Sequence, residues 1–149
     1  MSMASGDFGH VMSSASGITL EVVTFFAGGR RCAVEARQVR ALRPLSDEDG
    51  GNYPALDSVL GLSELNNTRS HRQILTIRLP ESDVEFSVAV PVELRKLELA
   101  AIHPLPDLVA ARTRLRGLCA LALEKDGLTL MFDLRECGAR CAPYGLRKY

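Results

Sequence analysis

The stretch ITLEVVTFFAGGRRCAVE (Ile18–Glu35) decides the fold, because it joins two extended runs through a tight turn. Apolar residues recur with the period of two that a half-buried β-strand requires. One face of the first run holds Ile18, Leu20, Val22, Thr24 and Phe26. Gly28–Gly29 can adopt the positive φ values of a two-residue hairpin turn without steric cost. The stretch therefore predicts a β-hairpin that returns along Arg30–Glu35.

A second hairpin is predicted where Gln73–Arg78 and Val84–Val90 flank the turn Leu79–Asp83. Apolar residues again alternate along the second of these runs. Pro91 is expected to end that strand or to mark an edge, because proline has no N–H to donate to a ladder.

A third hairpin is predicted over Leu115–Glu124 and Leu128–Phe132, with Asp126–Gly127 supplying the turn. Three hairpins along one chain predict a mainly β fold. The helical signals are short by comparison, and the sequence predicts no long helix.

Short helices are predicted at two places. DSVLGL (Asp57–Leu62) is typical of a helix stopped by Gly61, and Asp107 is placed to cap a helix over Leu108–Arg112. Val92–Ala101 fits both helical and strand spacing, and we interpret it as a short turn followed by a strand.

Composition excludes several classes of protein. The chain has 149 residues with 18 basic and 18 acidic side chains, so its formal charge is zero. General binding to nucleic acid or to anionic membranes needs surplus Lys and Arg, and is not expected here. Residues 1–17 have neither the basic start nor the apolar centre of a signal peptide and are expected to form a disordered tail. Together with cysteines that need no bridge, this favours the cytoplasm.

A faint repeat of strand, turn and strand, followed later by an Asp-led helix, predicts two β lobes. Their expected bounds are about residues 18–70 and 71–137, with a C-terminal tail over 138–149. Lobes of this size are marginally stable alone, so we expect them to pack against each other. The groove between them is the expected place for a partner.

No catalytic, metal or cofactor site is predicted. Cys137 and Cys141 form a CxxxC pair, but a closed zinc site needs four ligands and the histidines stand singly in the sequence, at His10, His71 and His103. Cys32 and Cys119 fall in strand patterns and are expected to be small apolar residues. Incidental thiols are the favoured interpretation, and a small cysteine- or metal-dependent enzyme is the alternative from another class.

Carboxylates are scattered along the chain. Asp57 and Asp133 each begin a short helix, where a capping role is the favoured interpretation. Asp47, Glu48 and Asp49 form an acidic run, which is predicted either to be a solvated connector or to repel a partner. No phosphate-binding glycine loop is present.

Two stretches, taken in order, resemble the CheW-like family of domains. VVTFFAGGRRCAVEARQVRAL (Val22–Leu42) is similar to the family's opening, where a Phe-x-x-Gly-Gly hairpin leads to a strand of small residues and then to a Val-x-x-Leu strand. IHPLPDLVAARTRLRGLCALALEKDGLTLMFDLREC (Ile102–Cys137) is similar to its end, including a Leu-Asp-Leu-like segment at Phe132–Leu134. The resemblance implies two tandem SH3-like β-barrels with short helices.

One part of the family pattern is absent. Typical members carry a strand-turn-strand with Asn-Leu-Arg-Gly before the Asp-led helix, whereas PLSDEDGGNYPALDSVLGL keeps only a Pro-Ala-Leu-Asp remnant at Pro54–Asp57. The first barrel is therefore expected to be shortened. Asn66, Asn67 and Arg69 follow the helix and are no substitute. Because the missing Arg belongs to the family's receptor-contacting region, binding to receptors is left open.

The resemblance implies a scaffold or adaptor without catalysis. CheW-like domains couple chemoreceptors to the histidine kinase CheA in signalling arrays at the membrane, and Val39, Arg40 and Leu42 match the family strand that faces the partner. An equally weighted interpretation is that Val39 and Leu42 only fill the first barrel. The favoured function is a chemotaxis adaptor, including a divergent member that binds one of the two usual partners. The alternative is a barrel that binds one partner or its own copies outside chemotaxis.

Overall fold

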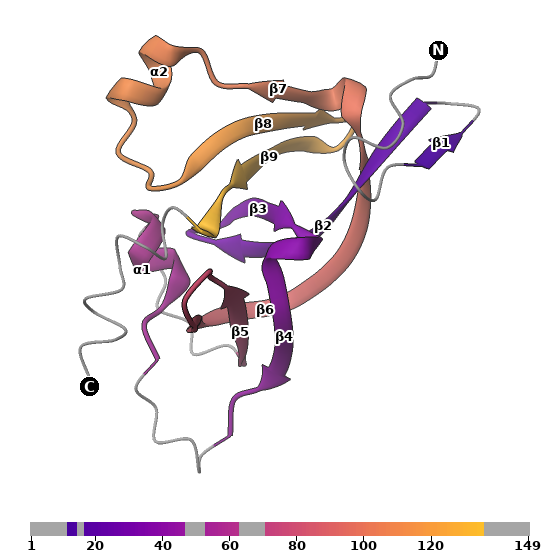
Figure 1. Cartoon of the computed structure of the whole chain (residues 1–149). Coiled ribbons are helices and arrows are strands. Elements are labelled where there is room, and N and C mark those ends of the chain that lie inside the picture. Colours follow the sequence, from indigo (N-terminus) through magenta and orange to yellow (C-terminus); the bar gives the residue numbers. More distant parts are fainter. Residues whose placement is uncertain (1–11, 15–16, 47–52, 63–70, 136–149) are drawn as a thin grey trace.

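The structure, a computed structural model, describes residues 12–14, 17–46, 53–62 and 71–135 (Figure 1). Within these residues the chain is mainly β, as predicted. The first four strands are β1 (Met12–Ser14), β2 (Gly17–Ala27), β3 (Arg30–Glu35) and β4 (Val39–Pro44). The other five are β5 (Arg72–Arg78), β6 (Asp83–Glu98), β7 (Ile102–Pro104), β8 (Leu118–Glu124) and β9 (Gly127–Phe132). The α-helices are α1 (Leu56–Leu60) and α2 (Asp107–Arg112), and two single 3-10 turns are η1 (Ala36–Gln38) and η3 (Leu99–Ala101).

The strands form one curled sheet in the order β4-β5-β6-β2-β3-β9-β8-β7, with β1 beside β2. Every pairing is antiparallel except that of β3 with β9, which is parallel. All three predicted hairpins are confirmed. In the first, Gly28 and Gly29 have φ values of 59° and 76°. In the third, Glu124 pairs with Gly127, so the turn is Lys125–Asp126 and not Asp126–Gly127.

The prediction that Pro91 ends its strand is wrong, because β6 continues to Glu98. Ala89 pairs with Phe26 and Glu93 pairs with Thr24, so two extra residues of β6 bulge out between these pairs. Pro91 lies in that bulge, where the ladder needs no N–H donor.

The interpretation of Val92–Ala101 as a turn followed by a strand has the order reversed. The strand comes first, as the second half of β6, and the turn η3 follows it. The reason is that β2 is long enough to pair with this half of β6 at Thr19–Thr24. The expected N-terminal tail also needs correction at residues 12–14, which pair with Gly17–Thr19 as β1.

Helix α1 confirms the predicted short helix, and Gly61 ends it with φ of 88°. A Cβ at Gly61 would lie 3.1 Å from the carbonyl oxygen of Arg114, so both its conformation and its surroundings favour glycine. The capping roles are wrong for two aspartates: Ala55 precedes α1 and Pro106 precedes α2, and neither helix has a side-chain cap. Asp133 does cap the turn after it, since its Oδ1 accepts a hydrogen bond from the amide of Arg135 at 3.1 Å.

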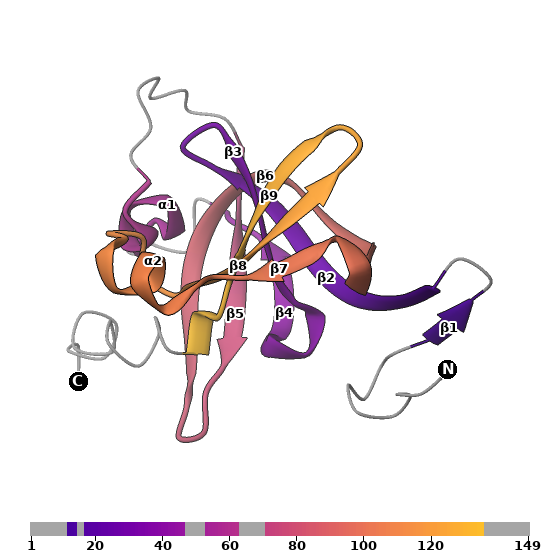
Figure 2. The same ribbon diagram turned by 90° about the horizontal axis from the view of Figure 1, so that it is seen from above.

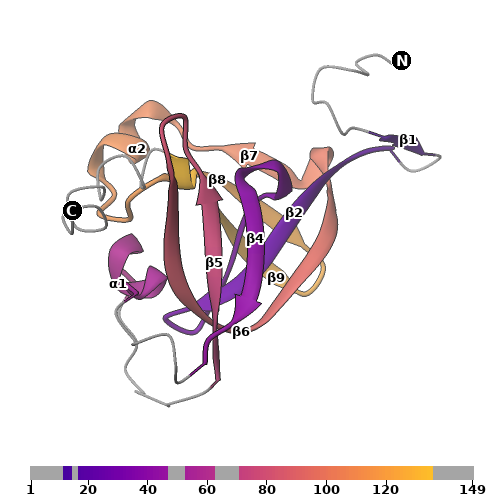
Figure 3. The ribbon, with the colours of Figure 1, turned by 60° about the horizontal axis from the view of Figure 1, so that its bottom comes forward.

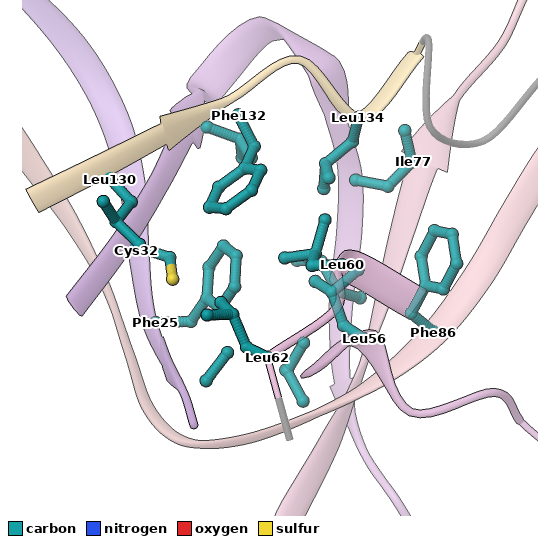
Figure 4. Packing of buried hydrophobic residues seen from close by; sticks show 14 of the residues in the cluster. Phe25, Cys32, Leu56, Leu60, Leu62, Ile77, Phe86, Leu130, Phe132 and Leu134 are labelled. Atoms are coloured by element: carbon teal, nitrogen blue, oxygen red, sulfur yellow. The ribbon is translucent and has the colours of Figure 1, made fainter. Parts of the chain in front are cut away.

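Two cores lie on opposite faces of β2, β3 and β9. The large core takes Phe25 and Ala27, Cys32 and Val34, and Leu130 and Phe132 from these strands, and it adds residues of α1, β5 and β6 (Figure 4). The small core takes the intervening Val22, Ala33 and Met131, together with Leu97, Ala120 and Ala122. The shared strands are therefore apolar on both faces, whereas an alternation of apolar and polar residues predicts a strand that is apolar on one face only.

The expected division of the chain near residue 70 stays a prediction. The hydrogen-bonded ladder crosses that point, because β4 pairs with β5 along its whole length. Helix α1 packs into the large core, where Leu56 and Leu60 are fully buried together with Leu134. The amide of Arg116 also donates to the carbonyl of Leu60 at 3.2 Å. The expected groove between the lobes stays a prediction.

Candidate functional site

Strand β4 ends the sheet on one side, and β5 is its strand neighbour within the described residues (Figure 3). Arg40, Ala41 and Leu42 of β4 are exposed, whereas its first residue, Val39, is half-buried. An exposed edge strand presents backbone N–H and C=O groups that another chain can pair with. Strand β4 therefore offers a docking edge.

The structure brings the three predicted partner-binding residues onto this strand and gives each a different environment. Val39 pairs with Ile77 and packs against the large core. Arg40 is exposed and its Nε lies 2.9 Å from Asp83 Oδ2. Leu42 keeps 40% of its surface exposed. Leu42 pairs with Leu75 of the large core, so both interpretations of these residues, contact with a partner and filling of the barrel, stay predictions.

Sequence reasoning missed a polar cluster beside this edge. Arg43 donates to the hydroxyl of Tyr53 at 2.9 Å, and its guanidinium carbon lies 5.7 Å from the centre of that ring. The same guanidinium lies 3.8 Å from Glu85 Oε2. Ten residues separate Arg43 from Tyr53, so no local motif links them. The register of β4 against β5 places this cluster on the face opposite to Leu42, because Leu42 pairs with the core residue Leu75 and Arg43 pairs with Ile74.

A second, more buried ion pair holds α1 in place behind this edge. Arg72 donates to Asp57 Oδ1 at 3.0 Å and to the hydroxyl and carbonyl of Ser87 at 3.2 and 2.9 Å. The side chains of Arg72 and Asp57 are 22% and 10% exposed. This explains why Asp57 does not cap its own helix: its carboxylate points to β5 and β6.

The two cysteines described by the structure lie in different environments. Cys32 is buried in the large core, and this burial raises the pKa of its thiol to about 12. Cys119 is exposed, contrary to the prediction, and its thiol lies 3.4 Å from the carbonyl of Met131. Among the described residues no three His, Cys, Asp or Glu side chains gather as metal ligands would.

Several predicted features lie outside the described residues. These are His10, the acidic run Asp47–Asp49, Asn66, Asn67 and Arg69, the CxxxC pair of Cys137 and Cys141, and the tail over 138–149. Of the described helices, none is long and apolar enough to cross a bilayer.

Two small β-barrels that share strands, with short helices between them, define this molecule as a double-barrel protein of the SH3-like type. The solved structure of the scaffolding protein TtCheW from Thermoanaerobacter tengcongensis has a similar fold: the TM-score is 0.59, and the match covers 79% of this chain and 91% of that one. Sequence identity over the match is 12%, so the likeness establishes the fold alone. No family model and no curated protein sequence matches the chain.

Proposed function

We propose that this chain is a non-catalytic adaptor of a bacterial chemosensory pathway, working in the cytoplasm. It links chemoreceptors to a CheA-type histidine kinase or modulates that link. The observation that carries the proposal is the likeness of its fold to a CheW scaffolding protein over 79% of the chain. The edge strand β4 supplies a surface on which such a role can rest.

In this proposal Val39 anchors β4 to the large core, and Leu42 and Arg40 meet the partner. Exposed apolar side chains within a polar rim are the usual source of binding energy in small interfaces. Arg40 is held by Asp83 in an exposed pair. Such a pair contributes less than about 1 kcal/mol, so Arg40 can exchange Asp83 for a carboxylate of the partner at little cost.

A binding experiment tests the proposal. The purified chain is titrated with a CheA regulatory domain and, separately, with a receptor hairpin, at concentrations up to tens of micromolar. We expect binding to the kinase domain, weakened about tenfold or more by Leu42→Asp. Leu128→Asp is the matched control, because Leu128 is 43% exposed and lies on β9, away from β4. Binding to neither protein, or equal losses in both variants, contradicts the proposal.

The receptor titration also tests the acidic run. If Asp47, Glu48 and Asp49 repel the receptor, replacing them with Asn, Gln and Asn raises receptor affinity, and added salt reduces the gain. An unchanged affinity assigns the run to a solvated connector.

A further inference from the structure

The apolar face of the sheet around the large core continues as far as its last strand, β4, which lies beside β5 (Figure 3). Leu42 pairs with Leu75, so the two side chains lie on the same face. Leu75 is fully buried in the large core, whereas Leu42 keeps 40% of its surface exposed. The edge of this face is therefore only partly covered by the described residues.

The opposite face of β4 is basic. Arg43 pairs with Ile74 and so lies on the face away from Leu42. The strand carries two arginines, Arg40 and Arg43, and no carboxylate. Both side chains are exposed, and each lies in an ion pair with a carboxylate of β6. Exposed ion pairs of this kind contribute less than about 1 kcal/mol, so a carboxylate on an added chain can replace them at little cost.

Pro44 indicates which backbone groups of β4 point away from β5. Proline has no N–H, and a strand tolerates it where its nitrogen faces away from the ladder. The direction of the backbone groups alternates along an antiparallel strand. The N–H and C=O of Leu42, two residues before Pro44, are therefore expected to point to the edge of the sheet, and those of Arg43 to β5. Leu42 then combines an apolar side chain with backbone groups that a further strand can pair with.

The charges of β4 favour an acidic strand over a second copy of β4. In an antiparallel pair of two copies that uses the whole strand, Ala41 lies opposite Leu42 and Arg40 lies opposite Arg43. Like charges placed directly opposite destabilise such a pair. A strand that alternates apolar and acidic residues fits both faces at once, with its apolar side chains beside Leu42 and its carboxylates beside Arg43.

We propose that β4 accepts an extended segment of a partner protein, in which apolar and acidic residues alternate, as an added strand of the sheet. The inference rests on the docking role proposed above for β4, and it adds how the partner is held there. When a strand is added to a sheet edge, the backbone hydrogen bonds supply affinity and the alternate side chains supply selectivity.

Hydrogen exchange of the full chain, measured by NMR with synthetic peptides, tests the proposal. The acidic probe is Thr-Val-Glu-Val-Glu-Val-Thr. A basic probe has Lys in place of both Glu, and a third probe has Pro in place of the central Val. We expect the acidic probe to bind about tenfold or more tightly than either of the others and to slow exchange of the Leu42 amide. The Arg43 amide is the internal control, because it should be protected with and without the peptide.

Variants of Arg43 test the charge preference. Arg43→Glu should reverse the preference, so that the basic probe binds more tightly, and Arg43→Gln should remove it. Arg112→Glu is the matched control: it changes the total charge as Arg43→Glu does, but Arg112 is an exposed residue of α2. It should keep the wild-type preference, and added salt should reduce that preference. Equal binding of the acidic and basic probes to wild type, or an unchanged preference in Arg43→Gln, overturns the proposal.

The remaining outcomes separate strand addition from the adaptor role. A Leu42 amide that is already protected in the free chain means that the chain covers its own edge, and overturns the proposal. So does a wild-type dimer that Leu42→Asp abolishes, because the edge is then taken by a second copy. If the CheA regulatory domain binds and leaves the Leu42 amide exchanging, strand addition is wrong and the adaptor role stands. If the acidic probe protects Leu42 while neither the kinase domain nor the receptor hairpin binds, strand addition stands and the adaptor role is wrong.

Discussion

The two cores of this molecule differ in side-chain composition although they share three strands. The large core contains Phe25, Phe86 and Phe132 together with long aliphatic side chains, and α1 closes it. Among the described residues the small core has no aromatic side chain. Ion pairs close its end instead: Arg31 with Asp126 at 3.1 Å, and Arg95 with Glu124 at 2.6 Å. Packing dominates one lobe, whereas charge supports the other, so they should differ in their response to truncation, salt and pH.

The largest effect is expected in the large core. Phe132→Ala removes an aromatic ring that is 2% exposed and should lower the free energy of unfolding by about 3–5 kcal/mol. Urea denaturation followed by circular dichroism measures this loss. Leu128→Ala, on the same strand but exposed, is the control. A loss below about 1 kcal/mol would show that the ring contributes little to this core.

Leu97→Ala tests the small core in the same way. Leu97 is 1% exposed, and its removal should lower the free energy of unfolding by about 2–3 kcal/mol, the low end for a buried leucine, because a small core can partly collapse. Leu94→Ala is a closely matched control, since Leu94 lies three residues earlier on β6 and is 66% exposed. A loss equal to that of Phe132→Ala would mean that the two cores are not different in strength.

The sharing of strands explains which features the sequence could predict. Turns and hairpins depend on local residues such as Gly28, Gly29 and Gly61, and these predictions were confirmed. The large core could not be predicted from alternation. Its residues Phe25 and Val23 lie on the face of β2 that a half-buried strand would expose to water. Pro91 misled for a related reason: β6 continues past it by pairing with β2, and Pro91 lies in the bulge of that ladder.

The strand that carries the candidate site was predictable, but the environments of its side chains were not. The family resemblance placed Val39, Arg40 and Leu42 on one strand, which the structure bears out. Which of them points into the core depends on the register of β4 against β5, and that register shifts between Val39 and Ala41. Tyr53 and Glu85 come from other segments of the chain, so only the folded structure shows the polar cluster that they form with Arg43.

The buried ion pair Arg72–Asp57 belongs to the large-core lobe and sharpens the comparison. Asp57→Ala should lower the free energy of unfolding by about 1–3 kcal/mol, because it leaves a largely buried guanidinium without its carboxylate. Asp83→Ala breaks the exposed pair with Arg40 and should lower it by less than about 1 kcal/mol. Urea midpoints of the two variants compare them directly. Equal losses of unfolding free energy in the two variants would contradict the role of Asp57 in anchoring α1.

The smallest effect concerns the ion pairs at the turn between β8 and β9, which the ribbon of Figure 2 shows in orange. A hydrogen bond from Arg31 lowers the pKa of the exposed Asp126 carboxyl in the folded protein. A carboxyl whose pKa is lower when folded stabilises the protein fully above its unfolded pKa of roughly 4, and loses this contribution as the pH falls through the lowered value. Wild type should therefore exceed Asp126→Asn in urea midpoint at pH 7, and the difference should shrink below about pH 4 and in high salt.

The control for this last prediction is Glu81→Gln, which removes an exposed carboxylate without an ion pair among the described residues and should show no such pH dependence. The guanidinium of Arg31 also lies 3.6 Å from Glu124 Oε2, so one ion pair remains in Asp126→Asn. Arg31→Met removes both pairs and should lower the urea midpoint further. If Arg31→Met and Asp126→Asn leave the urea midpoint and its salt dependence unchanged, the six buried apolar side chains of the small core stabilise it without the ion pairs. The two cores would then differ in size but not in the type of interaction that stabilises them.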